Sequence, residues 1–124
     1  MADAIAQGDI WWLLDEEPFG SEPGYTRPYL VVQSNPVNRS AIATIVACPL
    51  TRNLKLAAAP GNVLLRRGEA GLDYDSVVNV SGISSKARDR FYSYSGTVSP
   101  RRLQAALAGI ALILDPSDFL AGRR

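Results

Sequence analysis

Residues 27–47, RPYLVVQSNPVNRSAIATIVA, contain two apolar segments separated by a short polar one. Arg27 to Gln33 reads as a strand, with Pro28 near its start, where a missing backbone N–H disturbs pairing least. Ser34 to Arg39 reads as a turn or a short helical turn. Ala41 to Ala47 is apolar on both faces, so it predicts a strand in the centre of a sheet.

The preceding residues predict one more strand and a long loop. Gly8 to Asp15, GDIWWLLD, is rich in aromatic and aliphatic residues and reads as a strand. Its adjacent residues Trp11 and Trp12 then face opposite sides, so one belongs to the core and the other is a candidate for stacking or a dimer contact. Glu16 to Thr26 forms a connection of about ten residues, and loops of that length often carry function.

The remaining chain predicts short strands followed by one helix. Ser99-Pro100 is a helix start, and apolar residues then recur at three- and four-residue spacing at Leu103, Leu107, Ile110 and Leu114. We expect an irregular segment at 50–59, strands at 61–65 and 76–80, a polar segment at 66–75, and a charged bend with one short strand in 88–98. The pattern predicts a mainly β fold with α: a small β-barrel or strongly bent sheet, closed by a C-terminal helix.

Composition favours one domain over residues 1–124, with its core at about 8–114. The formal net charge is +1, from 13 Lys and Arg against 12 Asp and Glu, which argues against a sequence-blind grip on duplex DNA but permits a local basic groove. The chain has no histidine, which removes the usual base for Ser or Cys nucleophiles and the commonest zinc ligand. We therefore expect no metal site and no cofactor.

Cys48 is the only cysteine, so no internal disulfide forms, and we interpret it as a buried structural thiol. Met1 to Gln7 shows no signal-peptide pattern. The longest apolar run, Leu103 to Leu114, is interrupted and shorter than a bilayer span. We expect a cytoplasmic protein without a membrane partner.

Arg27 and Thr51 each allow two interpretations. A guanidinium fixed at a strand edge suits a phosphate, but Arg27 is equally placed for an ion pair with Glu16, Glu17 or Glu22. Thr51 follows the central strand and either offers a hydroxyl to a phosphate or leaving oxygen or caps a turn. The residues by themselves leave both questions open.

Four short motifs stand in a fixed order: Gly8-Asp9-Ile10-Trp11, Gly20-Ser21-Glu22, Arg27-Pro28, and Pro49-Leu50-Thr51. In this order and spacing they resemble the MazF/PemK family of bacterial toxins. Residues 75–83 and the helix at 99–114 fit the closing layout of that family, so the resemblance covers about residues 8–114.

The resemblance implies an SH3-like barrel and a homodimer with single-stranded RNA in a groove between the subunits. It implies a sequence-specific endoribonuclease that needs neither ribosomes nor metal and is neutralised by an acidic cognate antitoxin. Arg27 and Thr51 match the family's catalytic arginine and threonine, and Glu22 matches the acidic residue of its first loop. The candidate RNA contacts are Gly20, Ser21, Ser34, Asn35, Arg52, Asn79 and Ser81.

The chain differs from plasmid-type members of the family in one strand, and this difference affects the expected mechanism. Plasmid-type members carry an arginine and an aspartate in the strand that here reads Val78-Asn79-Val80-Ser81. Cleavage is therefore expected to use Arg27 and Thr51. Glu22 is the one nominee for general base, and neither that base nor the recognised RNA sequence follows from the chain.

Two alternatives come from other classes of function. Toxins of the same barrel poison DNA gyrase by binding protein, and a catalytically inactive SH3-like module would keep only the fold. The Arg27-Pro28 and Thr51 pattern argues against the first, and toxicity on expression would argue against the second.

Overall fold

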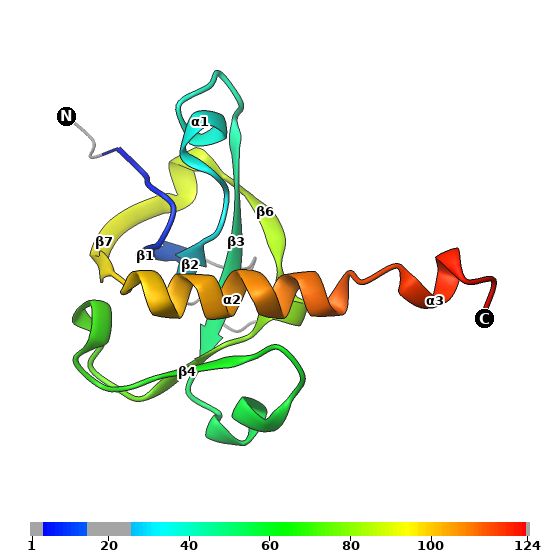
Figure 1. Cartoon of the computed structure of the whole chain (residues 1–124). Coiled ribbons are helices and arrows are strands. Elements are labelled where there is room, and N and C mark those ends of the chain that lie inside the picture. Colours follow the sequence, from blue (N-terminus) through cyan, green and yellow to red (C-terminus); the bar gives the residue numbers. More distant parts are fainter. Residues whose placement is uncertain (1–3, 15–25, 124) are drawn as a thin grey trace, which may run out of the picture.

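The computed structural model describes residues 4–14 and 26–123, which fold around a curved antiparallel sheet (Figure 1). Among these residues seven strands form the sheet in the order β4-β5-β3-β2-β1-β7, with β6 also paired to β3. The strands are β1 (Asp9–Leu14), β2 (Thr26–Val31), β3 (Thr44–Thr51), β4 (Val63–Leu65), β5 (Ser76–Val78), β6 (Ser84–Ala87) and β7 (Phe91–Thr97). The α-helices are α1 (Asn35–Asn38), α2 (Pro100–Ile113) and α3 (Ser117–Leu120), and the 3-10 turns are η1 (Leu54–Ala58), η2 (Glu69–Gly71), η3 (Val80–Gly82) and η4 (Arg88–Arg90).

Strand β3 is central, as its sequence predicts. It pairs with β2 on one side, while on the other its first half pairs with β6 and its end with β5. The change of partner falls around Pro49, which has no N–H to donate to a ladder. The predicted bounds of 41–47 are wrong at both ends. Pro49 lies where β3 changes partner and does not end the strand, which continues to Thr51. Residues 41–43 are exposed and belong to the preceding turn.

The two faces of the sheet bury two apolar clusters. Ile10, Leu30 and Cys48 belong to one cluster, and Trp11 and Tyr29 belong to the other. Trp11 is buried and Trp12 is half-buried, consistent with the prediction that they face opposite sides. Burial raises the pKa of the Cys48 thiol to about 12, which fits the structural role expected for it.

The other strands match the expected segments except for one omission. Strands β4 and β5 are shorter than predicted, and β7 is a seven-residue strand that follows the charged turn η4. Strand β6 was not predicted, because its sequence SSKA is polar and small. Backbone pairing with residues 44–47 of β3 holds this segment as a strand, although its side chains do not favour one.

Helix α2 begins where the sequence predicts, with Ser99 Oγ accepting a hydrogen bond from the Arg102 N–H at 3.2 Å. Its fully buried residues are Ala106 and Gly109, and Leu103 and Ile110 pack against the core beside them. The apolar spacing predicts that Leu107 and Leu114 also face the core, and this is wrong, because their exposed fractions are 36% and 66%. The helix buries its small residues because Gly109 lies directly against the backbone of Gly61, where a larger side chain has no room.

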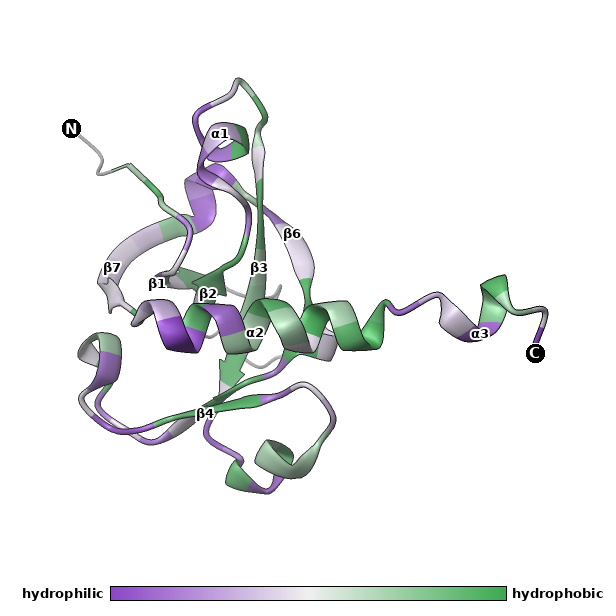
Figure 2. Cartoon of the chain, viewed as in Figure 1, coloured by the Kyte–Doolittle hydropathy of each residue, from purple (hydrophilic) through white to green (hydrophobic). Residues whose placement is uncertain are grey.

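The segment Pro100–Leu120 is 21 residues long and, by length and composition alone, could cross a membrane. This segment is longer than the run from Leu103 to Leu114 on which the sequence-based expectation rested. The segment is interrupted between α2 and α3, and α2 lies across the sheet while α3 points away from it (Figure 1). Figure 2 shows that the second half of α2 is hydrophobic. A single segment of this kind is weak grounds for a membrane anchor, because soluble proteins contain similar helices.

Candidate active site

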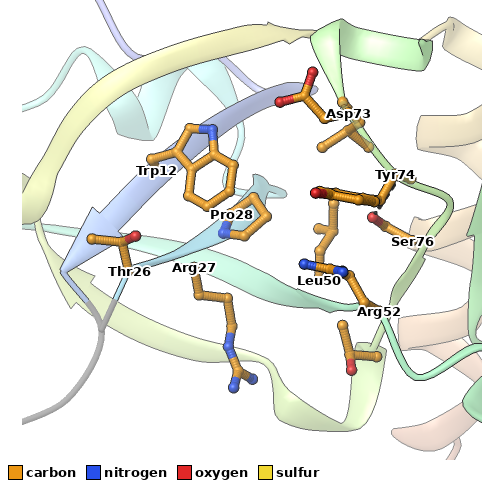
Figure 3. A pocket seen from close by; sticks show the side chains of 11 residues that line it. Trp12, Thr26, Arg27, Pro28, Leu50, Arg52, Asp73, Tyr74 and Ser76 are labelled. Carbon is orange, nitrogen blue, oxygen red and sulfur yellow. Dashed lines mark hydrogen bonds between the residues drawn. The ribbon is translucent and has the colours of Figure 1, made fainter. Parts of the chain in front are cut away.

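A pocket of about 280 Å³ opens where β2 begins and β3 ends (Figure 3). Three of the sequence-predicted residues, Arg27, Thr51 and Arg52, line it together. The other lining residues are Trp12, Thr26, Pro28, Leu50, Leu72, Asp73, Tyr74 and Ser76.

The strand register explains why Arg27 and Thr51 meet. Tyr29 of β2 pairs with Pro49 of β3, and extending this register by two residues sets Arg27 opposite Thr51. On its other side Arg27 pairs with Leu13 of β1, so its backbone is held within the sheet. Figure 3 shows the Arg27 side chain leaving β2 on the side away from Trp12 and Asp73. The Arg27 guanidinium therefore points away from Trp12, while the residue still contributes to the pocket lining.

The Thr51 hydroxyl oxygen accepts a hydrogen bond from the Asn53 N–H at 3.1 Å. A hydroxyl can accept such a bond and still donate its own hydrogen. Thr51 therefore does shape the turn after β3, and it can also donate to a phosphate held by Arg27. The two interpretations that the sequence leaves open are compatible.

Arg52 adds a second guanidinium to the pocket. Its central carbon lies 3.7 Å from the centroid of the Tyr74 ring, a cation–π contact that fixes both side chains. With Arg27 and Arg52 in one pocket, a nearly neutral chain presents a locally basic site suited to a phosphate.

Sequence reasoning missed the far wall of the pocket, formed by Asp73, Tyr74 and Ser76. These residues lie in or beside the segment 66–75, which reads only as polar. The one available signal was an aromatic residue, Tyr74, placed among charged residues between two strands. Trp12, which the sequence marks as a stacking candidate, lies on the opposite wall (Figure 3).

Ser34 and Asn35 lie away from this pocket. They follow the far end of β2, and seven residues of extended chain from Arg27 correspond to about 20 Å. Asn35 Oδ1 accepts hydrogen bonds from the Gln7 N–H at 2.7 Å and from Asn38 Nδ2 at 3.3 Å. The structure thus gives Asn35 a role in holding the start of α1.

Asn79 and Ser81 form a polar cluster next to the end of β3. Asn79 Oδ1 accepts hydrogen bonds from Ser81 Oγ at 3.0 Å and from Asn62 Nδ2 at 3.3 Å, and the Asn79 N–H donates to the Pro49 carbonyl at 2.9 Å. Neither residue lines the pocket beside Arg27. These contacts support the β3 segment that ends in Thr51.

Gly20, Ser21 and Glu22 lie outside the described residues, so the nominee for general base keeps only its sequence argument. In the part of the chain that the structure describes, no group of three His, Cys, Asp or Glu side chains is arranged to hold a metal ion.

Similarity to known proteins covers most of the chain. Residues 6–114 match the family model described as PemK-like, MazF-like toxin of type II toxin–antitoxin system. Endoribonuclease MazF2 of Mycobacterium bovis is 38% identical over 111 residues, covering 90% of this chain and 97% of that protein. Endoribonuclease EndoA of Bacillus subtilis is 30% identical over 86 residues, covering 69% of this chain and 73% of that protein.

Solved structures share the fold at lower identity. A MazE–MazF structure (Form-II) from Deinococcus radiodurans superposes with a TM-score of 0.76 at 23% identity, covering 91% of this chain and 97% of that chain. An endoribonuclease in complex with its cognate antitoxin from Mycobacterial species has a TM-score of 0.71 at 23% identity, covering 90% and 95%. These likenesses confirm the predicted small barrel-like sheet with a C-terminal helix. Because the family model spans residues 6–114, the chain belongs to the PemK-like, MazF-like toxins of type II toxin–antitoxin systems.

Proposed function

We propose that this toxin cleaves single-stranded RNA in the pocket around Arg27 and Thr51, without ribosomes or metal. The observation that carries the proposal is that two arginines, Arg27 and Arg52, and a hydroxyl residue, Thr51, line one pocket. Relatives at 38% and 30% identity are endoribonucleases, which supports RNA as the substrate.

The proposed reaction uses the substrate's own nucleophile. The ribose 2′-oxygen attacks the adjacent phosphorus in line, and the bond from phosphorus to the 5′-oxygen breaks. The 2′-hydroxyl proton passes to a base, and the departing 5′-oxygen gains a proton. The products are a 2′,3′-cyclic phosphate and a free 5′-hydroxyl.

Arg27 stabilises the negative charge that develops on the phosphoryl oxygens, and a preorganised donor of this kind contributes on the order of 3 kcal/mol. Thr51 donates its hydroxyl to a phosphoryl oxygen or to the leaving oxygen. Glu22, from the sequence argument alone, is the nominee for the base that accepts the 2′-hydroxyl proton.

The same proposal includes partners. A relative in fold is named in complex with its cognate antitoxin, so we expect an acidic antitoxin to bind this toxin and block its RNA groove. We also expect a homodimer, which the exposed apolar side chains of α2 support. An enzyme acting on mRNA is expected in the cytoplasm.

Substitution of Arg27 tests the proposal directly. We expect Arg27→Ala to lower the rate of single-stranded RNA cleavage by about 10² to 10³, the loss typical of one charge-stabilising donor. The measurement is cleavage of a labelled RNA, with circular dichroism to confirm folding. Arg101→Ala, which removes an exposed arginine from α2, is the matched control and keeps its activity. Wild-type rates in Arg27→Ala would rule out the assignment.

Two further assays separate mechanisms. Cleavage should continue unchanged in EDTA, and a strong loss on chelation would contradict the proposed chemistry. A plasmid supercoiling assay with DNA gyrase beside the RNA assay tests the gyrase alternative: inhibition of gyrase without RNA cleavage would favour that alternative.

A further inference from the structure

The pocket beside Arg27 has a second half that the proposed chemistry does not use. Trp12 and Pro28 form one wall and Tyr74 the other, and the Asp73 carboxylate lies at the end of the pocket opposite the Arg27 guanidinium (Figure 3). Phosphate chemistry alone explains neither the aromatic side chains on opposite sides of the pocket nor the carboxylate.

The backbone that presents Asp73 and Tyr74 is anchored on both sides. Leu72 before them and Ser76 after them are buried. Asp75 Oδ1 accepts a hydrogen bond from the Arg67 N–H at 2.7 Å, and Ser76 Oγ donates to the Tyr74 carbonyl at 3.0 Å. The side chains of Asp73 and Tyr74 are therefore presented outward from a fixed segment, and Tyr74 is 54% exposed. An anchored backbone reduces the entropy that this segment loses when a ligand binds.

The Arg52 guanidinium stacks on one face of the Tyr74 ring, with its central carbon 3.7 Å from the ring centroid, and gives this wall a positive charge. Proteins that bind single-stranded RNA stack unpaired bases on aromatic rings and arginine planes of this kind. The same pair also borders a neighbouring hollow lined by Leu54, Arg67 and Asp75. The Arg52–Tyr74 pair therefore lies between the pocket and this hollow, which is where side chains that separate two consecutive bases are expected.

We propose that the pocket half bounded by Trp12, Pro28, Arg52, Asp73 and Tyr74 is a nucleobase subsite for a base next to the phosphate held by Arg27. This inference rests on the proposed RNA cleavage. The whole pocket, which also includes Arg27 and Thr51, has a volume of about 280 Å³, near the lower end of small-molecule pockets at about 300 Å³, a size that suits one base beside one phosphate.

Asp73 gives the subsite a chemical preference. An ionised carboxylate only accepts hydrogen bonds, so it favours a base edge with an exocyclic amino group, as in cytosine, adenine or guanine. Uracil has no amino group, and its single donor, N3–H, is flanked by two carbonyl oxygens that the carboxylate repels. The subsite therefore selects amino-bearing bases over uracil at one position beside the cleaved bond.

Cleavage of a randomised single-stranded RNA pool, with the new ends sequenced, tests the preference. Asp73→Asn introduces an amide that can donate to a uracil oxygen, and we expect uracil to become about tenfold more frequent at one flanking position. Asp118→Asn, on α3 and far along the chain from the pocket, should leave all base frequencies unchanged. Identical frequencies in Asp73→Asn and the wild type would overturn the role of Asp73.

The stacking role has its own variants. Tyr74→Ala should lower kcat/KM for RNA about tenfold, whereas Tyr74→Phe, which keeps the ring, should restore it. Tyr92→Ala removes a tyrosine of similar exposure, 57%, from β7 and should cleave like the wild type. Equal kcat/KM for Tyr74→Ala and the wild type would overturn the subsite. If that variant also escaped inhibition by the antitoxin, the pocket would bind the antitoxin and not a base.

The two proposals fail in different ways. If the wild type cleaves no RNA, the proposed function fails and the subsite with it. If the wild type cleaves and Arg27→Ala does not, RNA cleavage stands whatever the Asp73 and Tyr74 variants show.

Discussion

At the scale of single residues, Thr51 combines a structural hydrogen bond with its proposed chemical role. It ends β3, lies opposite Arg27 in the extended register, and accepts the Asn53 N–H. Its hydroxyl hydrogen is oriented by none of these contacts, so it remains available for a phosphoryl or leaving oxygen. This separates its structural use as an acceptor from its proposed chemical use as a donor.

Replacing Thr51 by valine and by serine tests whether its hydroxyl contributes to cleavage. Thr51→Val keeps the shape but removes the hydroxyl, and loss of one hydrogen bond in the transition state should lower kcat at least about tenfold with KM little changed. Thr51→Ser keeps both donor and acceptor and should retain most of kcat. Steady-state cleavage of a short RNA gives both constants. Equal kcat in the valine and serine variants would leave Thr51 with a structural role alone.

At the scale of elements, the contact between α2 and the turn before β4 depends on two glycines. A Cβ at Gly109 would collide with the Gly61 carbonyl, and one at Gly61 would lie 2.8 Å from the Gly109 carbonyl oxygen. Gly61 also has a φ of +82°, which favours glycine. Helix α2 therefore packs closely here, through backbone rather than through large side chains.

The substitution Gly109→Ala tests this packing, because alanine raises helix propensity but adds a Cβ that collides with Gly61. Alanine raises helix propensity by about 1 kcal/mol, whereas overpacking a tight contact costs about 1–3 kcal/mol. We expect a net loss of stability on the order of 1 kcal/mol, measured by urea unfolding. Ala108→Ser, at an exposed position of the same helix, should stay within about 0.5 kcal/mol of the wild type. A stabilised Gly109→Ala protein would contradict the close contact.

A second link to α2 is electrostatic. Glu69 in η2 accepts hydrogen bonds from Arg102 Nε at 3.0 Å and Nη2 at 3.1 Å, and from the Arg66 N–H at 2.6 Å. The hydrogen bond from Arg102, which is the largest cause, lowers the pKa of the Glu69 carboxyl, and the Arg66 N–H adds to this effect. The pair joins residues 33 positions apart, so it ties the helix to the loop that precedes β5.

The lowered pKa predicts the direction of a pH effect. A carboxyl with a folded-state pKa below its unfolded value stabilises the fold above the unfolded pKa, near 4.3, and this stability is lost as pH falls through the folded pKa. Because both side chains are partly exposed, we expect about 1 kcal/mol at most. Urea unfolding at pH 7 and pH 3 should show a smaller decrease in Glu69→Gln than in the wild type. Asp89→Asn serves as an exposed-carboxylate control, and an equal decrease in wild type and Glu69→Gln would refute the effect.

At the scale of the whole molecule, the second half of α2 leaves large apolar side chains in solvent. Leu112 and Ile113 at the end of α2 are 56% and 37% exposed, and Leu114, directly after the helix, is 66% exposed. The second half of α2 is nevertheless hydrophobic (Figure 2). Contiguous exposed apolar surface of this kind usually marks an interface. This feature supports the proposed homodimer, with α2 in the contact between the two copies.

Analytical ultracentrifugation tests that arrangement. The wild type should sediment as a dimer, and Leu112→Glu should weaken dimerisation by about tenfold or more, because burying a leucine contributes roughly 1.5–3 kcal/mol. Val37→Glu, on α1 at 39% exposure, is the matched control and should remain dimeric. A Leu112→Glu protein as dimeric as the wild type would place the contact elsewhere, and a monomeric wild type would refute the dimer itself.

The sequence by itself determined the features that depend on local pattern. The start of α2 at Ser99-Pro100, the opposite faces of Trp11 and Trp12, and the central position of β3 follow from capping, two-residue alternation and an all-apolar strand. The order of the short motifs around Arg27 and Thr51 also led to the correct family, because a motif order is a property of the chain itself.

Only the tertiary structure decided what depends on pairing across the chain. Strand β6 exists through its ladder with β3, and small residues of α2 face the core through the Gly61–Gly109 approach, so neither has a local signal. Asp73 and Tyr74 read as part of a polar segment until the curved sheet brings them opposite Trp12. The physical reason is that a strand register and a backbone approach between distant segments set which side chains meet, and these are not encoded within any one segment.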